Sequence, residues 1–553
     1  EEETSRIRFI WDQTSNEGSS PFHYSYGTEY TKSQIESDIL NGYGPDSGLV
    51  REKDIEGHGT HVAGIAAGDG SSSDAGYVGV APKASIICVN SLFTTASVID
   101  GVEYVRDKAD QLGLPAAVNL SLGTQAGPHD GSSLFEQSID SLSEGDFLIA
   151  VSAGNSGDTP IHKRISFLSG SSEKSSFVIP DFTPSSIIGD YVELNGFYEP
   201  SGDLEVKVLG PGGLETDWVQ WGEMVQYETS SGNILISNGP SEENSDNELY
   251  FRIGDTGTNS PPEEGRWEFR FRATGDTLLD IWITQAVLGE RFVDLGFENG
   301  DSNYTIVEPG NADSVITVGS FNTRNSWNGH MVSGFPIGEL SSYSSKGPTR
   351  DGRSKPDIAA PGAWVISTLS GSYNPPSFYL ASDGSHYSAA GTSVAAPHVA
   401  GSVALLWHAA PELTRSEIVD TLTSTTDSVP SIDLNNTWGS GKLNIKRSVY
   451  STGVPEVQIE DGLWIKATPN PASEEVNFYF NIPDGVEEAK IKIFNIIGKP
   501  MKTIPSDQLN NGGMKYTWNL RNNNGVKLAN GLYIYTLTGD GRRSGLHRLV
   551  IRR

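Results

Sequence analysis

A serine within a run of small residues is the first candidate for chemistry in this chain. Ser393 lies between the small residues 389–392 and a helix-forming stretch, 394–401, which reads Val-Ala-Ala-Pro-His-Val-Ala-Gly. The pattern predicts that Ser393 stands at a helix N-terminus, where free N–H groups and the helix dipole favour a negative oxygen. Acyl transfer needs this arrangement because neighbouring amides can receive the oxyanion. A plain Gly-Thr-Ser helix cap has the same sequence, so the interpretation depends on partners elsewhere in the chain.

A histidine offers the general base that a serine nucleophile requires. His58 begins a predicted Gly/Ala-rich helix over 58–67, in the motif Gly-His-Gly-Thr-His-Val-Ala-Gly. Its ordinary pKa near neutrality suits proton transfer. His61 follows three positions later, a spacing that suggests metal ligation, but no Glu completes the zincin pattern. We therefore expect His61 to be a structural, hydrogen-bonded residue.

A carboxylate and an amide complete the set of candidate residues. Asp12, at the end of a predicted strand, would orient the imidazole and stabilise the imidazolium. Asp54 is the rival, but it lies among charged residues and we expect it to be a solvated loop charge. Asn155, in Val-Ser-Ala-Gly-Asn-Ser-Gly, follows another predicted strand, and its amide could donate to the oxyanion beside the N–H of Ser393. A plain Asx turn is the alternative for Asn155.

The elements around these residues alternate between strands and helices. Apolar runs over 5–11, 84–91, 116–122 and 146–152 are typical of strands, and the amphipathic segment 98–112 is typical of a helix. This alternation predicts an α/β fold with a doubly wound parallel sheet. Sites in such sheets form at the carboxyl ends of the strands, which is where the candidate carboxylate stands.

The alternation stops after residue 158 and resumes near residue 306. Between these positions, inward apolar residues alternate with polar ones and Gly/Pro clusters separate the runs, as in 204–208 and 267–272. We predict a β-sandwich, jelly-roll-like, inserted over 159–305. The α/β pattern returns at 314–319, continues through the helix after Ser393 and ends with a helix near 414–424.

The C-terminal part of the chain differs in charge and pattern. From residue 460 onward, 13 Lys and Arg stand against 9 Asp and Glu, a net charge of +4, whereas the rest of the chain carries −35. We predict a linker over 451–466 and a separate Ig-like β-sandwich over 467–553, with strands near 476–480, 489–494 and 532–537.

Composition excludes several classes of protein. A net charge of −31 makes a nucleic-acid or anionic-membrane partner unfavourable, and no transmembrane run is present in the sequence. The single cysteine, Cys88, lies in an apolar strand-like run and is expected to be a buried, unreactive thiol. Because the sequence begins with Glu1, we expect a processed or trimmed chain.

The order Asp, His, Asn, Ser and the two motifs around His58 and Ser393 resemble the subtilisin-like serine protease (subtilase) family. The resemblance covers about 5–158 and 306–450. It implies a subtilisin-like catalytic domain formed by 1–158 and 306–450, with Asp12, His58 and Ser393 as the triad and Asn155 as a donor to the oxyanion. The stretch 119–123 matches the strand that pairs with substrate. The resemblance also implies that the pocket beside the scissile bond is lined by Ser121, Leu122, Gly123, Ala153 and Gly154.

Two finer resemblances concern the branch and the tail. Trp11-Asp12-Gln13-Thr14, Gly127-Pro128-His129-Asp130-Gly131 and the inserted sandwich resemble the spore-germination-protease-like branch of the family. Pro469-Asn470-Pro471, the stretch 493–499, Ala529–Tyr533 and the basic end 546–553 resemble a type IX secretion sorting domain. A generic Ig-like adhesive or stabilising module is the alternative for the tail.

Together these features predict a secreted or cell-surface serine endopeptidase that acts on proteins or peptides. The secretion machinery would be a further partner, through the C-terminal module. No cofactor is expected to be required; calcium is possible, but no loop has EF-hand spacing. Two alternatives stay open: a non-catalytic binding or scaffold protein on a protease fold, and a narrow processing peptidase.

Overall fold

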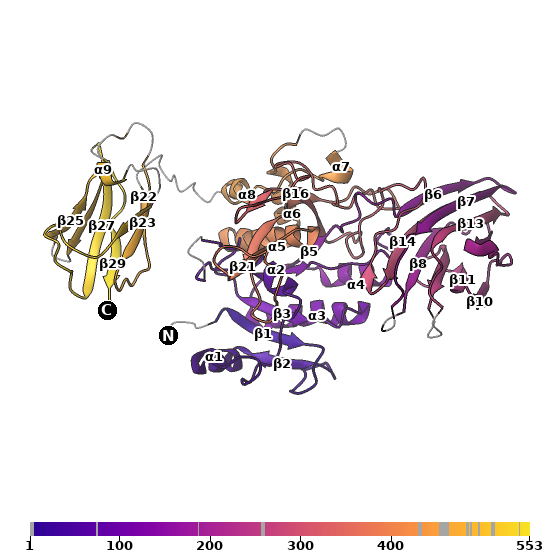
Figure 1. Ribbon diagram of the computed structural model, residues 1–553, viewed down its shortest axis with the longest axis horizontal. Helices are drawn as coiled ribbons and strands as arrows, with labels where there is room; N and C mark the ends of the chain where they lie inside the picture. Colours follow the sequence, from indigo (N-terminus) through magenta and orange to yellow (C-terminus); the bar gives the residue numbers. More distant parts are fainter. Residues whose placement is uncertain are drawn as a thin grey trace. The chain divides into compact units, whose positions relative to one another are not determined.

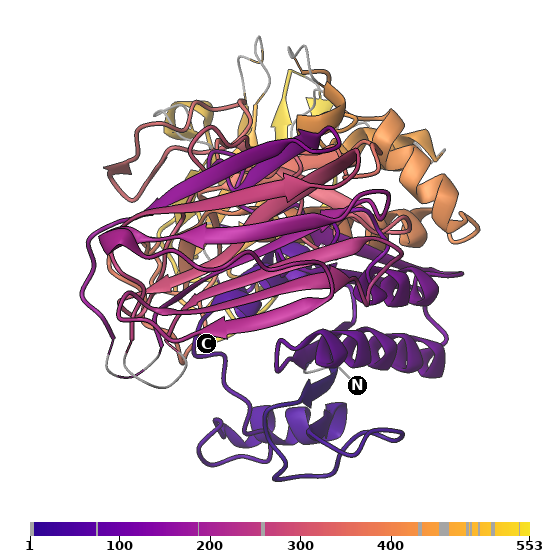
Figure 2. The same ribbon diagram turned by 90° about the vertical axis from the view of Figure 1, so that its right-hand side faces the viewer.

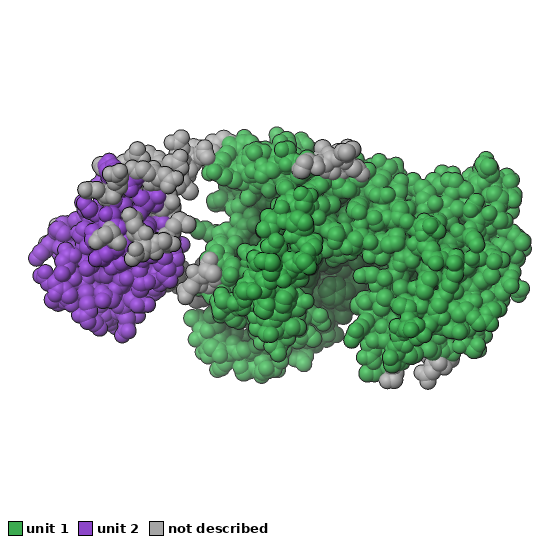
Figure 3. Space-filling view, turned by 45° about the horizontal axis from the view of Figure 1, so that its top comes forward, with its two compact units in different colours: residues 1–454 green, residues 455–553 purple. Residues whose placement is uncertain are grey.

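The computed structural model describes residues 5–553, except for 73–75, 186, 188, 256–259, 430–433, 453–463, 483–485, 487–488, 496–497, 510–514 and 541. The chain forms two compact units, residues 1–454 and 455–553 (Figure 3). Each unit has its own hydrophobic core.

A parallel sheet forms the centre of the first unit (Figure 1). Its four strands lie in the order β19-β16-β5-β4, and they are β4 (Ala116–Leu120), β5 (Phe147–Ser152), β16 (Ile316–Asn322) and β19 (Ile358–Ala363). A smaller sheet has the order β2-β1-β3, in which β1 (Ile7–Asp12) pairs in parallel with β3 (Ile86–Asn90) and antiparallel with β2 (Thr28–Thr31).

Helices cover both faces of the parallel sheet because its strands are apolar on both faces. In β5 every residue is buried: Leu148 and Ala150 pack in the core formed with α5 (Thr392–Ala409), and Ile149 and Val151 in the core formed with α3 (Thr95–Leu112) and α4 (Leu134–Leu142). Strands buried on both faces are typical of doubly wound sheets. The predicted fold class is therefore confirmed.

The other helices of the first unit are ten residues long or shorter. Helix α2 packs on α5, and α6 on both α5 and α8. Thr414 and Glu417 form a capping box that starts α6 where the sequence predicts its last long helix. The bounds are α1 (Lys32–Asn41), α2 (His58–Ala67), α6 (Arg415–Ser424), α7 (Leu434–Thr437) and α8 (Ile445–Ser451).

The insert consists of two antiparallel sheets, whose strands run side by side at the front of Figure 2. One contains β10-β11-β12-β8-β14-β15 with β6 beside β14, and the other contains β7-β13-β9. Alternate residues of β9 and β13 point into the core between the sheets, as the period of two predicts. The bounds are β6 (His162–Phe167), β7 (Ser172–Ile179), β8 (Tyr191–Tyr198), β9 (Leu204–Leu209), β10 (Glu223–Tyr227), β11 (Asn233–Pro240), β12 (Asn247–Gly254), β13 (Gly265–Ala273), β14 (Thr277–Leu288) and β15 (Arg291–Phe292).

The insert contacts the loop that follows β4. The rings of His129 and Trp282 stack with their centroids 4.2 Å apart. Arg350 forms ion pairs with both Asp130 in the loop and Asp246 in the insert. These contacts place the sandwich against the segment that continues from the predicted substrate strand.

The short hairpins of the first unit and the strands of the second complete the fold. The hairpins pair β17 (Ser326–Trp327) with β18 (His330–Met331), and β20 (Val365–Thr368) with β21 (His386–Ala389). The second unit has one sheet of β22 (Trp464–Thr468), β23 (Val476–Asn481) and β26 (Lys515–Trp518), and another of β24 (Lys490–Asn495), β25 (Pro500–Ile504), β27 (Gly531–Gly539), β28 (Arg542–Arg543) and β29 (His547–Ile551). The predicted linker over 451–466 falls mostly on 453–463, outside the described residues, and its last three residues, 464–466, belong to β22.

Candidate active site

The four predicted residues stand at the ends of elements in the first unit. Asp12 is the last residue of β1, and His58 is the first residue of α2. Asn155 follows β5 by three positions, and Ser393 is the second residue of α5. Strand ends and helix N-termini are the parts of an α/β fold where free backbone groups and side chains meet.

Ser393 and Asn155 border one small space. Gly391 has φ +153°, and a Cβ built there would lie 3.1 Å from Ser393 Oγ and 3.6 Å from Asn155 Nδ2. Any other residue at this position would be strained in its backbone and would occupy the space that the two side chains border. The glycine two residues before Ser393 therefore leaves this space open, and the serine hydroxyl and the Asn155 amide both border it.

Thr392 fixes the direction of the Asn155 amide. Asn155 Oδ1 accepts hydrogen bonds from the Thr392 N–H at 2.9 Å and from its hydroxyl at 3.0 Å. The Nδ2 end is thereby left for a ligand, which is the end that an oxyanion needs. The N–H of Ser393 belongs to the first turn of α5, where backbone donors have no partner within the helix. The sequence did not single out Thr392, although it adjoins the predicted nucleophile.

A proline in α5 leaves Ser393 free to bond with the predicted substrate strand. Pro397 has no N–H, so the carbonyl of Ser393, four residues earlier, lacks the usual helical donor. Ser121 Oγ donates to that carbonyl at 2.6 Å. Asn119 Nδ2 in turn donates to Ser121 Oγ at 3.0 Å. The missing helical bond thus becomes a link between α5 and the segment after β4.

The carboxylate of Asp12 is buried and is held on one oxygen. Its Oδ1 accepts from the Thr14 N–H at 3.0 Å, from Thr14 Oγ1 at 2.6 Å and from Asn90 Nδ2 at 3.1 Å. Of the hydrogen bonds among the described residues, none joins Asp12 to His58 or His58 to Ser393. Such catalytic bonds are often long in free enzymes and shorten when substrate binds.

His58 has a lowered pKa. The protein around His58 partly desolvates its imidazole, which disfavours the charged form and lowers the pKa, although the residue as a whole is exposed; Asp54 and Glu56 act in the opposite direction. The predicted role of Asp54 as a solvated loop charge is wrong. Its Oδ1 accepts from the Gly57 N–H at 2.7 Å and its Oδ2 from the Thr60 N–H at 2.7 Å, so it satisfies donors at the start of α2.

His61 is buried in the first unit and is hydrogen-bonded, as its sequence context suggests. Its Nε2 lies 3.2 Å from the carbonyls of both Val365 and Tyr387. Burial lowers its pKa to about 4, so the ring is neutral at physiological pH. No group of three or more His, Cys, Asp or Glu side chains among the described residues is arranged to hold a metal ion.

Val307 lies between the two predicted walls of the substrate pocket. A Cβ added to Gly123 would meet Val307 Cγ2 at 2.4 Å, and one added to Gly154 would meet Val307 Cγ1 at 2.7 Å. The Val307 N–H donates to the Ala153 carbonyl at 3.0 Å. The next residue, Glu308, exchanges backbone hydrogen bonds with Thr124. Sequence reasoning missed Val307 because the whole insert separates it from the other wall residues.

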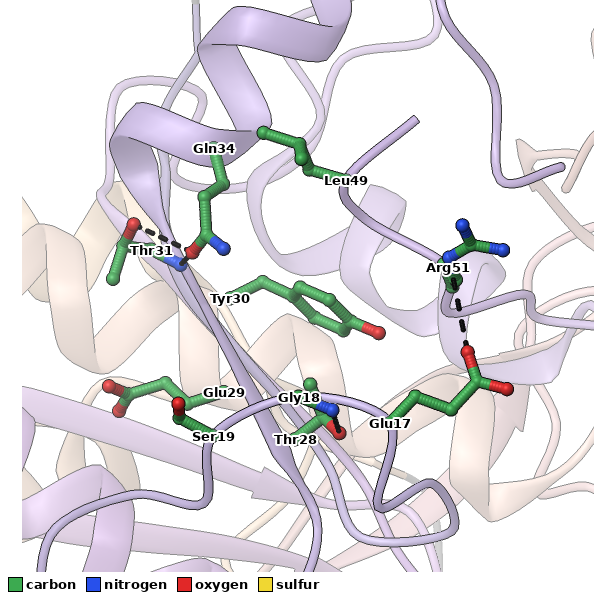
Figure 4. Close-up of a pocket in the computed structure, with 10 residues that line it drawn as sticks. All are labelled: Glu17, Gly18, Ser19, Thr28, Glu29, Tyr30, Thr31, Gln34, Leu49 and Arg51. Carbon is green, nitrogen blue, oxygen red and sulfur yellow. Dashed lines mark hydrogen bonds and ion pairs between the residues drawn. The ribbon is translucent and has the colours of Figure 1, made fainter. Parts of the chain in front are cut away.

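A polar recess of about 610 Å³ opens elsewhere, beside β2. Figure 4 shows the ring of Tyr30 in its middle, with Arg51 and Glu17 on one side and Gln34 on another. The Arg51–Glu17 pair is 3.9 Å apart and well exposed. The residues that line the recess do not include Asp12, His58 or Ser393. The recess is therefore separate from the space beside the serine.

The Cys88 thiol and the lengths of the described helices can also be compared with the sequence predictions. Burial raises the pKa of the Cys88 thiol to about 12, so little thiolate forms near neutral pH. Within the described part of the chain, no helix is long and apolar enough to span a membrane.

Comparisons with known proteins find relatives for both units. A profile of the subtilase family matches residues 11–193 and 275–441, and a FlgD Ig-like domain profile matches 468–542. Serine protease AprX of Bacillus subtilis is 37% identical over 158 residues, which cover 27% of this chain and 33% of that protein. Minor extracellular protease Vpr of B. subtilis is 26% identical over 440 residues, 76% of this chain and 48% of that one. The chain thus spans half or less of these two relatives.

Among solved structures, the CspB protease of Clostridium perfringens superposes with a TM-score of 0.66 at 25% identity, covering 82% of this chain and 90% of that one. The family profile matches both segments that form the parallel sheet and carry the four predicted residues. The profile match extends over more than half of the chain and agrees with the fold. The chain belongs to the subtilase family.

Proposed function

We propose that the protein is a serine endopeptidase that hydrolyses peptide bonds through an acyl-enzyme intermediate. The observation that carries this proposal is the space that Ser393 Oγ and Asn155 Nδ2 share beside Gly391. A nucleophile and a fixed amide donor that face one point are what acyl transfer requires. Membership of a family whose relatives are named serine proteases supports the same reaction.

In the proposed reaction, Ser393 Oγ attacks the peptide carbonyl carbon while His58 takes the hydroxyl proton. The carbonyl oxygen becomes an oxyanion that accepts hydrogen bonds from Asn155 Nδ2 and the N–H of Ser393. His58 then gives its proton to the leaving amine, and the C–N bond breaks. Water then attacks the acyl carbon while His58 takes a proton from it; the bond from that carbon to Ser393 Oγ breaks, and His58 returns the proton to Ser393 Oγ. Asp12 keeps the imidazole in the required tautomer throughout.

We infer that the acyl part of the substrate lies along Ser121, Leu122 and Gly123, with its side chain in the pocket that these residues form with Ala153 and Gly154. The bond from Ser121 to the Ser393 carbonyl supports this placement, since it holds the strand beside the nucleophile. The reaction itself requires no metal or other cofactor; any role of calcium would be in stability.

Hydrolysis of a peptide library tests the proposal. Wild-type protein should cleave internal peptide bonds, with and without a chelator, and Ser393→Ala should lose turnover by several orders of magnitude. Ser402→Ala is the matched control, because Ser402 lies on the same helix and donates only to the His398 carbonyl. A folded wild-type protein without activity would instead support a scaffold role, and cleavage confined to one sequence would indicate a processing peptidase.

We further propose that the protein falls in the spore-germination-protease-like branch that its motifs resemble. Supporting this, the stretch 127–131 lies against the insert: the Gly127 N–H donates to Asn195 Oδ1 at 3.0 Å, and His129 stacks on Trp282. A phylogeny of aligned catalytic segments, with and without the insert, would test the assignment. Placement outside that branch in both trees would refute it.

We also propose that the protein is secreted and that the C-terminal unit serves as a type IX sorting signal. The FlgD Ig-like match establishes only an Ig-like domain there, and the name of Vpr describes an extracellular relative. The motifs at the two ends of the unit support the finer assignment. Expression in a host with this secretion system should give extracellular protein with the full chain and intracellular protein when the chain ends at residue 454.

A further inference from the structure

Asn90 contacts the carboxylate that the proposed mechanism uses to orient His58. The residue ends β3, and the parallel register places it directly beside Asp12. The pairing continues one residue further, because the Gln13 N–H donates to the Asn90 carbonyl at 3.0 Å. Neighbours in register point to the same face of a sheet, so the amide of Asn90 and the carboxylate of Asp12 lie side by side.

The hydrogen bonds on Asp12 are unevenly shared between its two oxygens. Oδ1 accepts all three: two from Thr14 and one from Asn90 Nδ2 at 3.1 Å. Oδ2 accepts none from a described residue. A carboxylate oxygen with three donors has no good site for another, whereas the free oxygen keeps its full accepting capacity.

We propose that Asn90 is a positioning residue for the triad, which holds Asp12 through Oδ1 so that Oδ2 faces the imidazole of His58. Thr14 is only two residues from Asp12 in the sequence, so its hydrogen bonds do not fix the carboxylate relative to another element. Asn90 ties the carboxylate to a different strand, and it thereby fixes the rotation of the carboxylate plane. The hydrogen bond from the Asn90 amide also stabilises the negative charge on the carboxylate. It thereby limits how strongly Asp12 stabilises the imidazolium.

Other ionisable groups near Asp12 and His58 could also change the pH dependence of the reaction. Glu52 lies near Asp12 and Asp54, and burial with these two charges raises its pKa to about 7. Tyr30 also lies in the field of Asp12, while Asp54, Glu56 and His61 lie near His58. Because Glu52 titrates in the range of interest, every pH profile should be measured in the wild-type and in the Glu52→Gln background.

Two substitutions of similar volume test the proposal, which rests on the proposed function. Asn90→Leu removes the donor without adding charge, and should lower kcat about 10-fold while KM stays within about two-fold. Asn90→Asp keeps the shape, removes the donor and adds a negative charge, and should raise the acidic pKa of kcat/KM by about one unit. Asn322→Leu is the control, because Asn322 also ends a strand, β16, and its buried amide donates to the Pro336 carbonyl and accepts from Ser341 Oγ, with no hydrogen bond to Asp12, His58 or Ser393.

Stability and labelling measurements keep the outcomes distinct. If Asn90→Leu and Asn322→Leu lower the unfolding temperature alike while both keep wild-type kcat and pH profile, the role of Asn90 is structural only and the proposal is wrong. The same holds if Asn90→Asp leaves the acidic limb unchanged. Failure of Ser393→Ala to abolish turnover would refute the proposed function itself, before any Asn90 variant is interpreted.

Discussion

At the scale of single residues, the predicted oxyanion donor is held beside Ser393 by hydrogen bonds, whereas no hydrogen bond among the described residues joins the members of the predicted triad. Asn155 and Ser393 are fixed around one space by Thr392 and Gly391. Among the described residues, no hydrogen bond joins Asp12 to His58 or His58 to Ser393. Preorganised donors act on the transition state without rearrangement, so the amide should contribute chiefly to kcat.

Asn155→Ala should therefore lower kcat roughly 10²–10³-fold with little change in KM, the usual cost of one oxyanion donor. Steady-state kinetics on a peptide cleaved by the wild-type protein provide the measurement. A variant with raised KM and unchanged kcat would place Asn155 in substrate binding rather than in oxyanion stabilisation.

The lowered pKa of His58 predicts the pH dependence. A base whose pKa lies below its usual value of 6.5 stays neutral to lower pH, so activity should persist below 6.5 and disappear only as the pH falls through the lowered pKa. Plots of kcat/KM against pH for the wild type and for Glu52→Gln should lose activity over the same acidic range. An acidic limb near pH 7 that vanishes in Glu52→Gln would assign it to Glu52 instead.

At the scale of elements, local patterns predicted where the chemistry lies but not what surrounds it. The helix over 58–67, the strand before Asn155 and the helix after Ser393 follow from periodicity and small-residue motifs. Val307 and Asn90 lie beside the predicted site residues because of contacts across the fold, which no local pattern encodes. The charged sequence around Asp54 indicates a solvated loop residue, whereas in the structure a turn brings its carboxylate to the start of α2.

The position of Val307 predicts a narrow pocket. Its methyl groups fill the gap between Gly123 and Gly154, so the wild-type protein should prefer small side chains before the scissile bond. Val307→Gly should raise the ratio of kcat/KM for Phe over Ala at that position by roughly 10-fold or more, since pocket volume of this size is worth about 1–3 kcal/mol. Val307→Ala should be intermediate. Equal ratios in all three proteins would show that Val307 does not limit the pocket.

At the scale of the whole molecule, the chain is divided into units with separate cores and opposite net charge. The change in charge and pattern along the sequence predicts this division. In the structure, the first unit ends at residue 454 and the second begins at residue 455. Every residue placed in the proposed reaction lies in the first unit.

A chain that ends at residue 454 should hydrolyse small peptides with nearly wild-type kcat/KM. The physical reason is that the first unit buries its own core and holds all of the proposed catalytic groups. Circular dichroism establishes folding, and peptide kinetics give the comparison. A folded but inactive shortened chain would make the C-terminal unit part of the active protein.

Covalent labelling identifies the nucleophile of the proposed reaction. The protein should be treated with a fluorophosphonate, digested and analysed by mass spectrometry, beside Ser393→Ala and the control Ser402→Ala. We predict one adduct on Ser393 in the wild type and in Ser402→Ala, and none in Ser393→Ala. An adduct that persists in folded Ser393→Ala, or that maps to another residue in the wild type, would contradict the account.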